Sequence, residues 1–135
     1  MKLLTAEEIL EKDDSTFEDV DVPEWGGAVR IQALTADQRD VYEESIIKVS
    51  GEGKKRSRDV IMRGIRAKLV AASAVNERGE RLFTVAMVDR LGKKSAAALD
   101  RLFAVAQRLS ALDEEDVEKL AGKSEADPNS ASSTS

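Results

Sequence analysis

Side chains capable of acid–base or metal chemistry are scarce in this sequence, and their spacing does not suit such chemistry. The chain has no histidine and no cysteine, which excludes imidazole catalysis, thiolate nucleophiles, thiolate zinc sites and disulfides. Its carboxylates occur as neighbouring pairs, at Glu7/Glu8, Asp13/Asp14 and Glu114/Glu115, and adjacent helical residues point in different directions. We therefore expect no catalytic residue, no cofactor, no metal site and no enzyme.

Phosphate binding is the other chemistry that the residue types suggest. Seven basic residues and the single acid Asp59 lie between Lys54 and Lys68, although the chain as a whole has a net charge of -5. No aromatic residues alternate with the basic ones. We therefore interpret this segment as a solvated linker, in which Asp59 is the N-cap of the following helix, in preference to a nucleic-acid patch. The two glycine-containing stretches, at 25–27 and 51–53, lack the further residues of nucleotide-binding loops.

The element that must organise the chain is a central helix predicted over Asp59–Val75. Ile61, Ile65, Leu69 and Ala72 recur on one face of such a helix, and its last two turns are apolar on nearly every side. A helix of this kind needs cover from the flanking elements or from another protein. We expect it to share a core with the preceding hairpin.

The N-terminal half contains two capping-box patterns, Thr5 with Glu8 and Thr35 with Gln38. They predict a short helix over about 6–11 and a longer one that ends near Ser50. Between them, the alternation of apolar residues around a Pro-Glu-Trp-Gly-Gly turn predicts a β-hairpin at about 16–33.

The C-terminal half is expected to be helical. A short extended piece at 80–83 precedes Thr84, a predicted N-cap for a helix over about 85–91. Ser95 begins a second long helix to about 109, and Asp113 begins a last one to about 121. Residues 122–135 cannot bury apolar surface and are predicted to be a disordered tail.

These elements define the expected fold class and location. We predict one α+β domain over residues 1–121, predominantly α-helical, with an N-terminal β-hairpin followed by about four helices. No run of about 18 apolar residues occurs, and the start turns acidic where a signal peptide would turn apolar. We expect a cytoplasmic protein without a membrane partner.

A series of short motifs resembles the tail assembly chaperones of long-tailed, siphovirus-like bacteriophages. The series runs through Val22-Pro23-Glu24-Trp25-Gly26-Gly27, Leu34-Thr35-Ala36 with Arg39-Asp40, Arg66-Ala67-Lys68-Leu69-Val70, Glu80-Arg81-Leu82-Phe83 and Leu112 followed by the acidic run Asp113–Asp116. The resemblance covers roughly residues 16–121. It implies a non-catalytic, mostly helical protein of the host cytoplasm that is absent from the finished virion. Such a protein binds the tape-measure protein and keeps it soluble while tail-tube subunits polymerise.

Further partners implied by the resemblance are the major tail tube protein and a frameshift-extended form of the chain itself. We also expect a homo-oligomer or an exposed apolar groove near the second half of the central helix and the helix that carries Leu99, Leu102 and Phe103, because the alanines of the central helix leave room for another helix. Trp25 has two readings, a lid over the core or an exposed contact. The predicted partner-binding residues are Trp25, Arg66, Leu69, Val70, Ala71, Ala74, Phe83, Leu102 and Phe103.

A different class of function remains as the alternative. A small nucleic-acid-associated regulator would use the basic residues of the central helix, for which Arg56, Arg63 and Arg66 must share a face, with Arg58 and Lys68 nearby.

Overall fold

Helices and short strands alternate along the chain, of which the computed structural model describes residues 1–112 and 114–120. In chain order the elements are α1 (Ala6–Glu11), β1 (Phe17–Val22), η1 (Pro23–Trp25), β2 (Gly27–Gln32), α2 (Ala36–Ser45), β3 (Ile47–Ser50), η2 (Gly53–Lys55), β4 (Ser57–Val60), α3 (Ile65–Ser73), β5 (Ala74–Val75), η3 (Val85–Met87), α4 (Val88–Leu91), α5 (Ala96–Leu109) and α6 (Glu114–Leu120), where η marks a 3-10 helix. The predicted mixture of helix and strand is confirmed, with helices in excess, and five α-helices follow the first hairpin within the described residues where about four were expected.

The first hairpin, made of β1 and β2, forms where the alternation of apolar residues predicts it. The strands are antiparallel, with Phe17 opposite Gln32 and Val22 opposite Gly27. Val20, Val22 and Ile31 are buried, so one face of the hairpin enters the core and fixes the register. The short strand β5 pairs with the other edge of β2, and α3 and α5 pack on the hairpin.

Helix α3 is the centre of the core, as predicted. Leu69 and Val70 are fully buried, and the small side chains of Ala67 and Ala71 allow neighbouring helices to approach closely. Its main partner is α5, which Ser95 caps by accepting a hydrogen bond from the Ala98 amide. Apolar side chains from α3, α5 and the first hairpin form one continuous cluster. The shared core that the sequence predicts is therefore confirmed.

The predicted start of the central helix is wrong, because residues 47–60 form a second hairpin. Helix α2 ends at Ser45 rather than near Ser50, and β3 pairs with β4 so that Ile47 lies opposite Val60. The Ile61 amide donates to the Ile46 carbonyl at 2.6 Å and closes the base of this hairpin. Helix α3 begins only after Gly64, whose φ of 78° is left-handed. Asp59 is therefore a strand residue and not an N-cap.

The C-terminal half follows the prediction with smaller differences. Thr84 precedes a 3-10 turn and a one-turn helix in place of a single helix, and its side chain makes no capping hydrogen bond. Helix α5 has the predicted bounds, and α6 lies within the last predicted helix. Asp113, predicted as the N-cap of α6, and the predicted tail lie outside the described residues.

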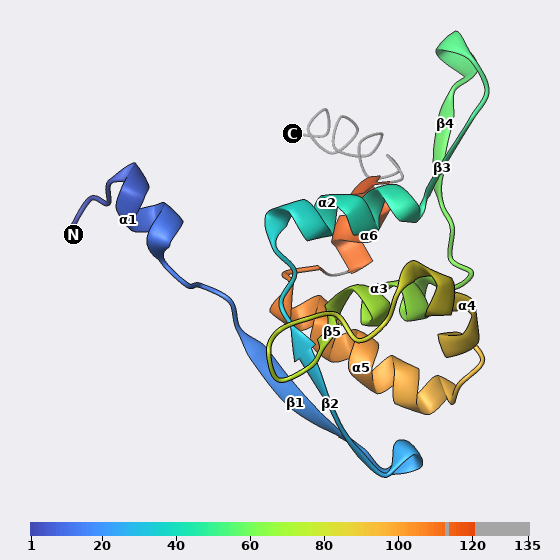
Figure 1. Ribbon diagram of the computed structural model, residues 1–135. Helices are drawn as coiled ribbons and strands as arrows, with labels where there is room; N and C mark the ends of the chain where they lie inside the picture. The colour runs from blue at the N-terminus through green and yellow to red at the C-terminus, as the bar shows by residue number, and fades with distance from the viewer. Residues whose placement is uncertain (113, 121–135) are drawn as a thin grey trace, which may run out of the picture.

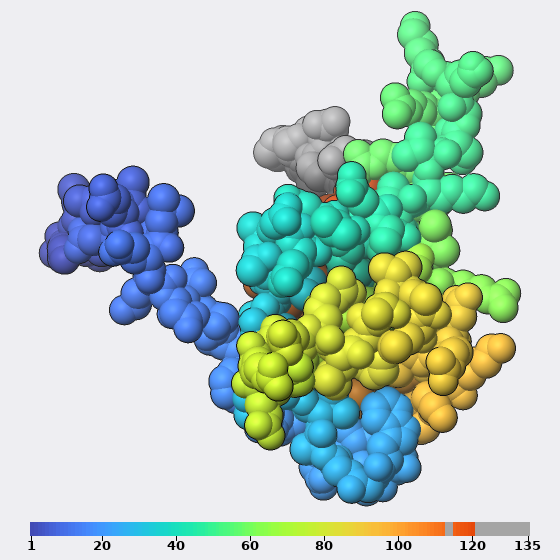
Figure 2. All heavy atoms as spheres, in the orientation of Figure 1, coloured from blue at the N-terminus to red at the C-terminus, as the bar shows by residue number. Residues whose placement is uncertain are grey.

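Two parts of the molecule project from the packed body. Helix α1 stands apart at the end of an extended segment, and the tip of the β3–β4 hairpin extends away on another side (Figure 1). The space-filling view shows both as separate lobes around a body formed by α2, α3, α4, α5 and the first hairpin (Figure 2).

Candidate partner-binding groove

A groove of about 500 Å³ lies between α2, α3 and the segment formed by η3 and α4. Its walls come from three parts of the chain that are distant in sequence, so only the folded chain creates it. The lining residues are Asp37, Gln38, Val41, Tyr42, Ser45, Lys68, Ala71, Ala72, Arg81, Val85, Val88 and Asp89.

Buried residues form the floor of the groove, and its rim carries apolar side chains that stay exposed among the described residues. Tyr42 and Ala71 are buried, and Ala72 and Val88 are half-buried. Val41 and Val85 are 59% and 81% exposed. Branched apolar side chains beside a hollow of this size are suited to the apolar face of a helix or an extended peptide.

Two cations hold the walls of the groove together. Lys68 Nζ donates to the Ser45 carbonyl at 2.8 Å, and the Arg81 guanidinium donates to the Ala71 carbonyl at 3.2 and 3.3 Å. Both carbonyls belong to the last turns of helices, where orphan oxygens and the helix dipole favour positive charge. The cations therefore fix the spacing of the walls while the apolar rim stays open.

The acidic groups of this groove are a buried phenol and two carboxylates of the rim. Burial raises the pKa of Tyr42, so the phenol stays neutral at physiological pH. The two carboxylates of the rim, Asp37 and Asp89, come from different elements, and no group of three or more metal-binding side chains occurs among the described residues.

Five of the predicted partner-binding residues belong to the core instead of a surface. Their exposed fractions are close to zero, so they lie in the core of this structure and their assignment to partner binding stays a prediction; they are Leu69, Val70, Ala71, Ala74 and Leu102. The physical reason is that α5 and the first hairpin cover more of α3 than its apolar pattern suggested. Of the five, Ala71 lines the floor of the groove.

The other four predicted residues stay partly accessible but lie outside the groove lining. Trp25, Phe83 and Phe103 are half-buried and pack against the core, which favours the lid reading of Trp25. Arg66 is exposed, pairs with Asp100 of α5, and places its guanidinium 5.9 Å from the centre of the Phe103 ring.

Sequence reasoning missed the rim residues Val41 and Val85. The buried residues of α2 and its C-terminal end are Tyr42 and Ile46, while Val41 stays exposed. Val85 lay in a predicted helix and was given no role. The one available signal was the apolar surplus around Ala71 and Ala72, both of which line the groove.

Comparison with known proteins identifies the family. A family model described as phage tail assembly chaperone matches residues 6–120. The chain belongs to this family. The curated proteins and solved structures compared with the chain gave no match. The match confirms the resemblance seen in the motif series, and it spans every described strand and helix from α1 to α6.

Membership of a tail assembly chaperone family agrees with a groove suited to contacts with another protein. It also bears on the alternative of a nucleic-acid regulator, which needs its basic residues on one helix face. That requirement is not met, because Arg56 and Arg58 lie on the second hairpin and Arg63 precedes α3.

Within the described residues, every helix is too short or too polar to cross a membrane.

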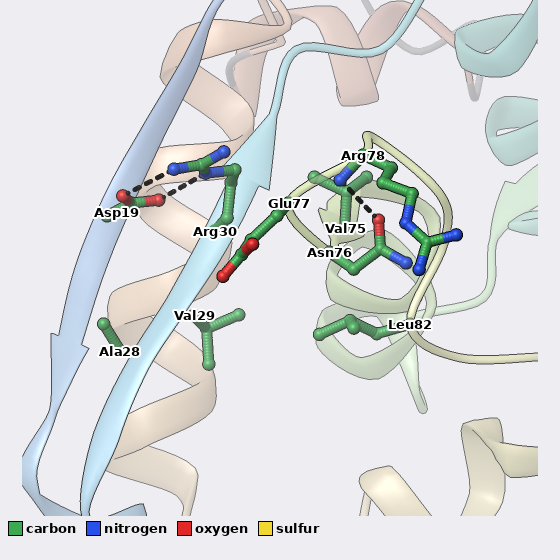
Figure 3. A pocket seen from close by; sticks show the side chains of 9 residues that line it. All are labelled: Asp19, Ala28, Val29, Arg30, Val75, Asn76, Glu77, Arg78 and Leu82. Carbon is green, nitrogen blue, oxygen red and sulfur yellow. Dashed lines mark hydrogen bonds and ion pairs between the residues drawn. The ribbon is translucent and has the colours of Figure 1, made fainter.

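A second hollow of this chaperone, of about 520 Å³, lies between the first hairpin and the loop at 76–82 (Figure 3). Arg30 donates to both carboxylate oxygens of Asp19 at 2.7 and 3.0 Å, and this pairing lowers the pKa of Asp19. Glu77 extends from the loop towards β2 in this view, while Arg78 lies on the far side. Charges of both signs line the hollow, so it favours neither an anion nor an apolar ligand.

Proposed function

We propose that this chain binds an apolar helical segment of the tape-measure protein in the groove between α2, α3 and η3–α4. Binding there keeps the tape-measure protein soluble in the host cytoplasm while tail-tube subunits polymerise along it. The chaperone then leaves and is absent from the virion. The proposal rests on family membership and on one structural observation, the uncovered apolar rim beside a closed floor.

The shape of the groove supports transient binding. A long tape-measure helix left bare would aggregate through its apolar stripe, and a partner that buries part of this stripe prevents aggregation. Aromatic and arginine anchors dominate the energy of tight interfaces. In this groove Tyr42 is buried in the floor and the Arg81 guanidinium already donates to the Ala71 carbonyl, so the contact rests mainly on the two exposed valines of the rim. Weak contacts of this kind allow an assembling tube subunit to displace the chaperone.

Those predicted partner-binding residues that stay partly exposed extend the proposed contact. Phe83 is two residues from Val85 in the sequence and half-buried, and we propose it as a contact beside the groove. Trp25, Arg66 and Phe103 are kept as proposed contacts outside the groove. The major tail tube protein and a frameshift-extended form of the chain are the further partners that we propose.

The test replaces the exposed rim valines by a charged residue. Val41→Glu and Val85→Glu each place a carboxylate where the apolar partner would lie, and we expect binding to a tape-measure fragment to weaken by about tenfold or more. Both positions are exposed, so the free energy of unfolding should change by no more than about 0.5 kcal/mol. Co-expression with the tape-measure protein and titration of the soluble fragment measure the effect.

Ala104→Glu is the matched control, because Ala104 is an exposed residue of α5 outside the groove lining. It adds the same charge to the same fold. Equal binding by the wild type, the control and both groove variants would show that the groove is not the site. Loss of binding in all three would point to net charge as the cause.

A further inference from the structure

The two projecting parts of the chain have opposite charge. We call residues 1–16 the arm and residues 47–60 the basic hairpin. The arm contains five acids and two bases, a net side-chain charge of −3, and the basic hairpin contains five bases and two acids, a net side-chain charge of +3. This opposition does not depend on the groove or on the proposed function.

The arm exposes apolar side chains that no described residue covers. Helix α1 has no buried residue, and Leu3 and Leu10 are 88% and 83% exposed. Thr5 and Glu8 form a complete capping box, which stabilises the N-terminus of the helix. A helix of six residues is nevertheless too short to be stable in water without a packing surface. The exposed leucines indicate that this surface comes from another molecule.

Charges on the arm are available for such a contact. Glu8 is occupied by its capping hydrogen bonds and by Lys2, whose Nζ lies 2.7 Å from its carboxylate. Within the described part of the chain, Glu7 and Glu11 have no such partner. Together with Asp14 they give the arm an acidic surface beside its leucines.

The basic hairpin is held in a fixed shape and points its cations outward. Arg58 donates to the Leu120 carbonyl at 2.6 Å and anchors β4 on α6. Gly51 has a φ of 84°, and a Cβ at this residue would lie 2.2 Å from the Lys55 carbonyl oxygen, so only glycine fits the turn. The side chains of Lys54, Lys55 and Arg56 at the tip make no ion pair with any described residue. Val49 adds an apolar side chain that is 47% exposed.

The arm and the basic hairpin project on different sides of the body, with α2 between them (Figures 1 and 2). We propose that the arm of one copy docks on the basic hairpin of a second copy, with its acids facing the tip cations and its leucines facing Val49. The contact joins different surfaces of the two copies, so it can repeat and build an open row or a closed ring. It uses no groove residue and leaves every groove free.

Such a row would bring several grooves to one long partner at once. Linked sites bind a shared partner more tightly than single ones, because each later contact is intramolecular. A chain that covers an extended partner gains from this arrangement even when each groove binds weakly.

The test uses charge reversal in the full-length chain, and mass is measured by light scattering across protein and salt concentration. The arm variant E7K/E11K keeps the Thr5–Glu8 cap, and the hairpin variant K54E/K55E keeps the Arg58 anchor. We expect each variant alone to self-associate on the order of tenfold more weakly than the wild type. Raising the salt concentration should dissociate the wild type, because exposed charges are screened.

Mixing the two variants is the decisive measurement. In an equal mixture, the acidic arm of K54E/K55E meets the basic hairpin of E7K/E11K. The reversed, acidic hairpin of K54E/K55E likewise meets the reversed, basic arm of E7K/E11K. Association should therefore recover when the two variants are mixed in equal amounts. K93E/K94E, a reversal at two exposed lysines between α4 and α5, should change nothing.

A wild type that is monomeric at every concentration overturns the proposal, as does a mixture that stays dissociated. Binding of the basic hairpin to nucleic acid without self-association would overturn it in favour of that ligand. Val85→Glu should still self-associate, which separates this test from that of the groove.

Discussion

The two β-hairpins of this chain have the same antiparallel pairing but opposite relations to the core. The first inserts Val20, Val22 and Ile31 between helices and is covered on one face. The second contains no buried residue, and only Ile47 and Val60 at its base are half-buried. The first hairpin is therefore a structural part of the domain, and the second is a surface presented by it.

The largest difference between the hairpins should appear when an apolar side chain is truncated. Ile31→Ala removes a fully buried side chain next to α3 and α5 and should lower the free energy of unfolding by about 2–5 kcal/mol. Val49→Ala in β3 should change it by no more than about 0.5 kcal/mol. Denaturant unfolding measures both. A large effect at Val49 would mean that the second hairpin packs in solution.

The glycines at the two turns offer the second test. Gly26 and Gly51 both have positive φ, but an added Cβ has free space at Gly26 and collides with the Lys55 carbonyl at Gly51. Gly51→Ala should therefore open the second hairpin locally, at a cost of about 1–3 kcal/mol, while Gly26→Ala costs about 1 kcal/mol. Hydrogen exchange should show lost protection in β3 and β4 with the core unchanged. Uniform loss of protection would mean that the second hairpin is coupled to global folding.

The same contrast explains what could be predicted from the sequence. In the first hairpin, burial of one face produces an alternation of apolar residues, and this alternation predicts the hairpin where it forms. In the second, Ile46 and Val49 follow Tyr42 at helical spacings of four and seven residues, and the alternation is too short to outweigh this pattern. Pairing across the Gly51–Gly53 turn, which involves residues on both sides, decided the structure instead.

The groove was predictable only in part. The sequence shows that Ala71 and Ala72 leave room for another helix, and both line the groove. Whether Val41 or Val85 faces the core or solvent depends on how η3 and α2 pack around α3. Apolar spacing within one element carries no information about such an arrangement.

Acid should weaken the attachment of the first hairpin to α5. Arg101 donates to both carboxylate oxygens of Glu24 at 2.9 and 3.0 Å, which lowers the pKa of Glu24 to about 2 from its ordinary value of 4.5. Because the folded-state pKa is lowered, this stabilisation is complete above about pH 4.5 and is lost as the pH falls to about 2. The melting temperature of Glu24→Gln should lie below that of the wild type at neutral pH, and the difference should vanish near pH 2.

Arg101→Gln supplies the control for that measurement. If the ion pair is the cause, Arg101→Gln removes the same contribution and the same pH dependence. A difference between wild type and Glu24→Gln that persists unchanged to pH 2 would show that the carboxylate does not titrate as part of this pair.

The smallest expected effect comes from one opposite-charge pair across each hairpin. Asp19 faces Arg30 across β1 and β2, and Lys48 faces Asp59 across β3 and β4. Arg30 binds Asp19 through two hydrogen bonds and lies 4.0 Å from the centre of the Phe17 ring, so three side chains restrict one another. No ion pair joins Lys48 and Asp59 among the described residues. Exposed ion pairs contribute little to stability unless their geometry is fixed. A double-mutant cycle in melting temperature should therefore give a small positive coupling between Asp19 and Arg30. The same cycle should give no coupling above error between Lys48 and Asp59. Equal couplings in the two hairpins would show that packing against the core does not decide whether a cross-strand charge pair stabilises this fold.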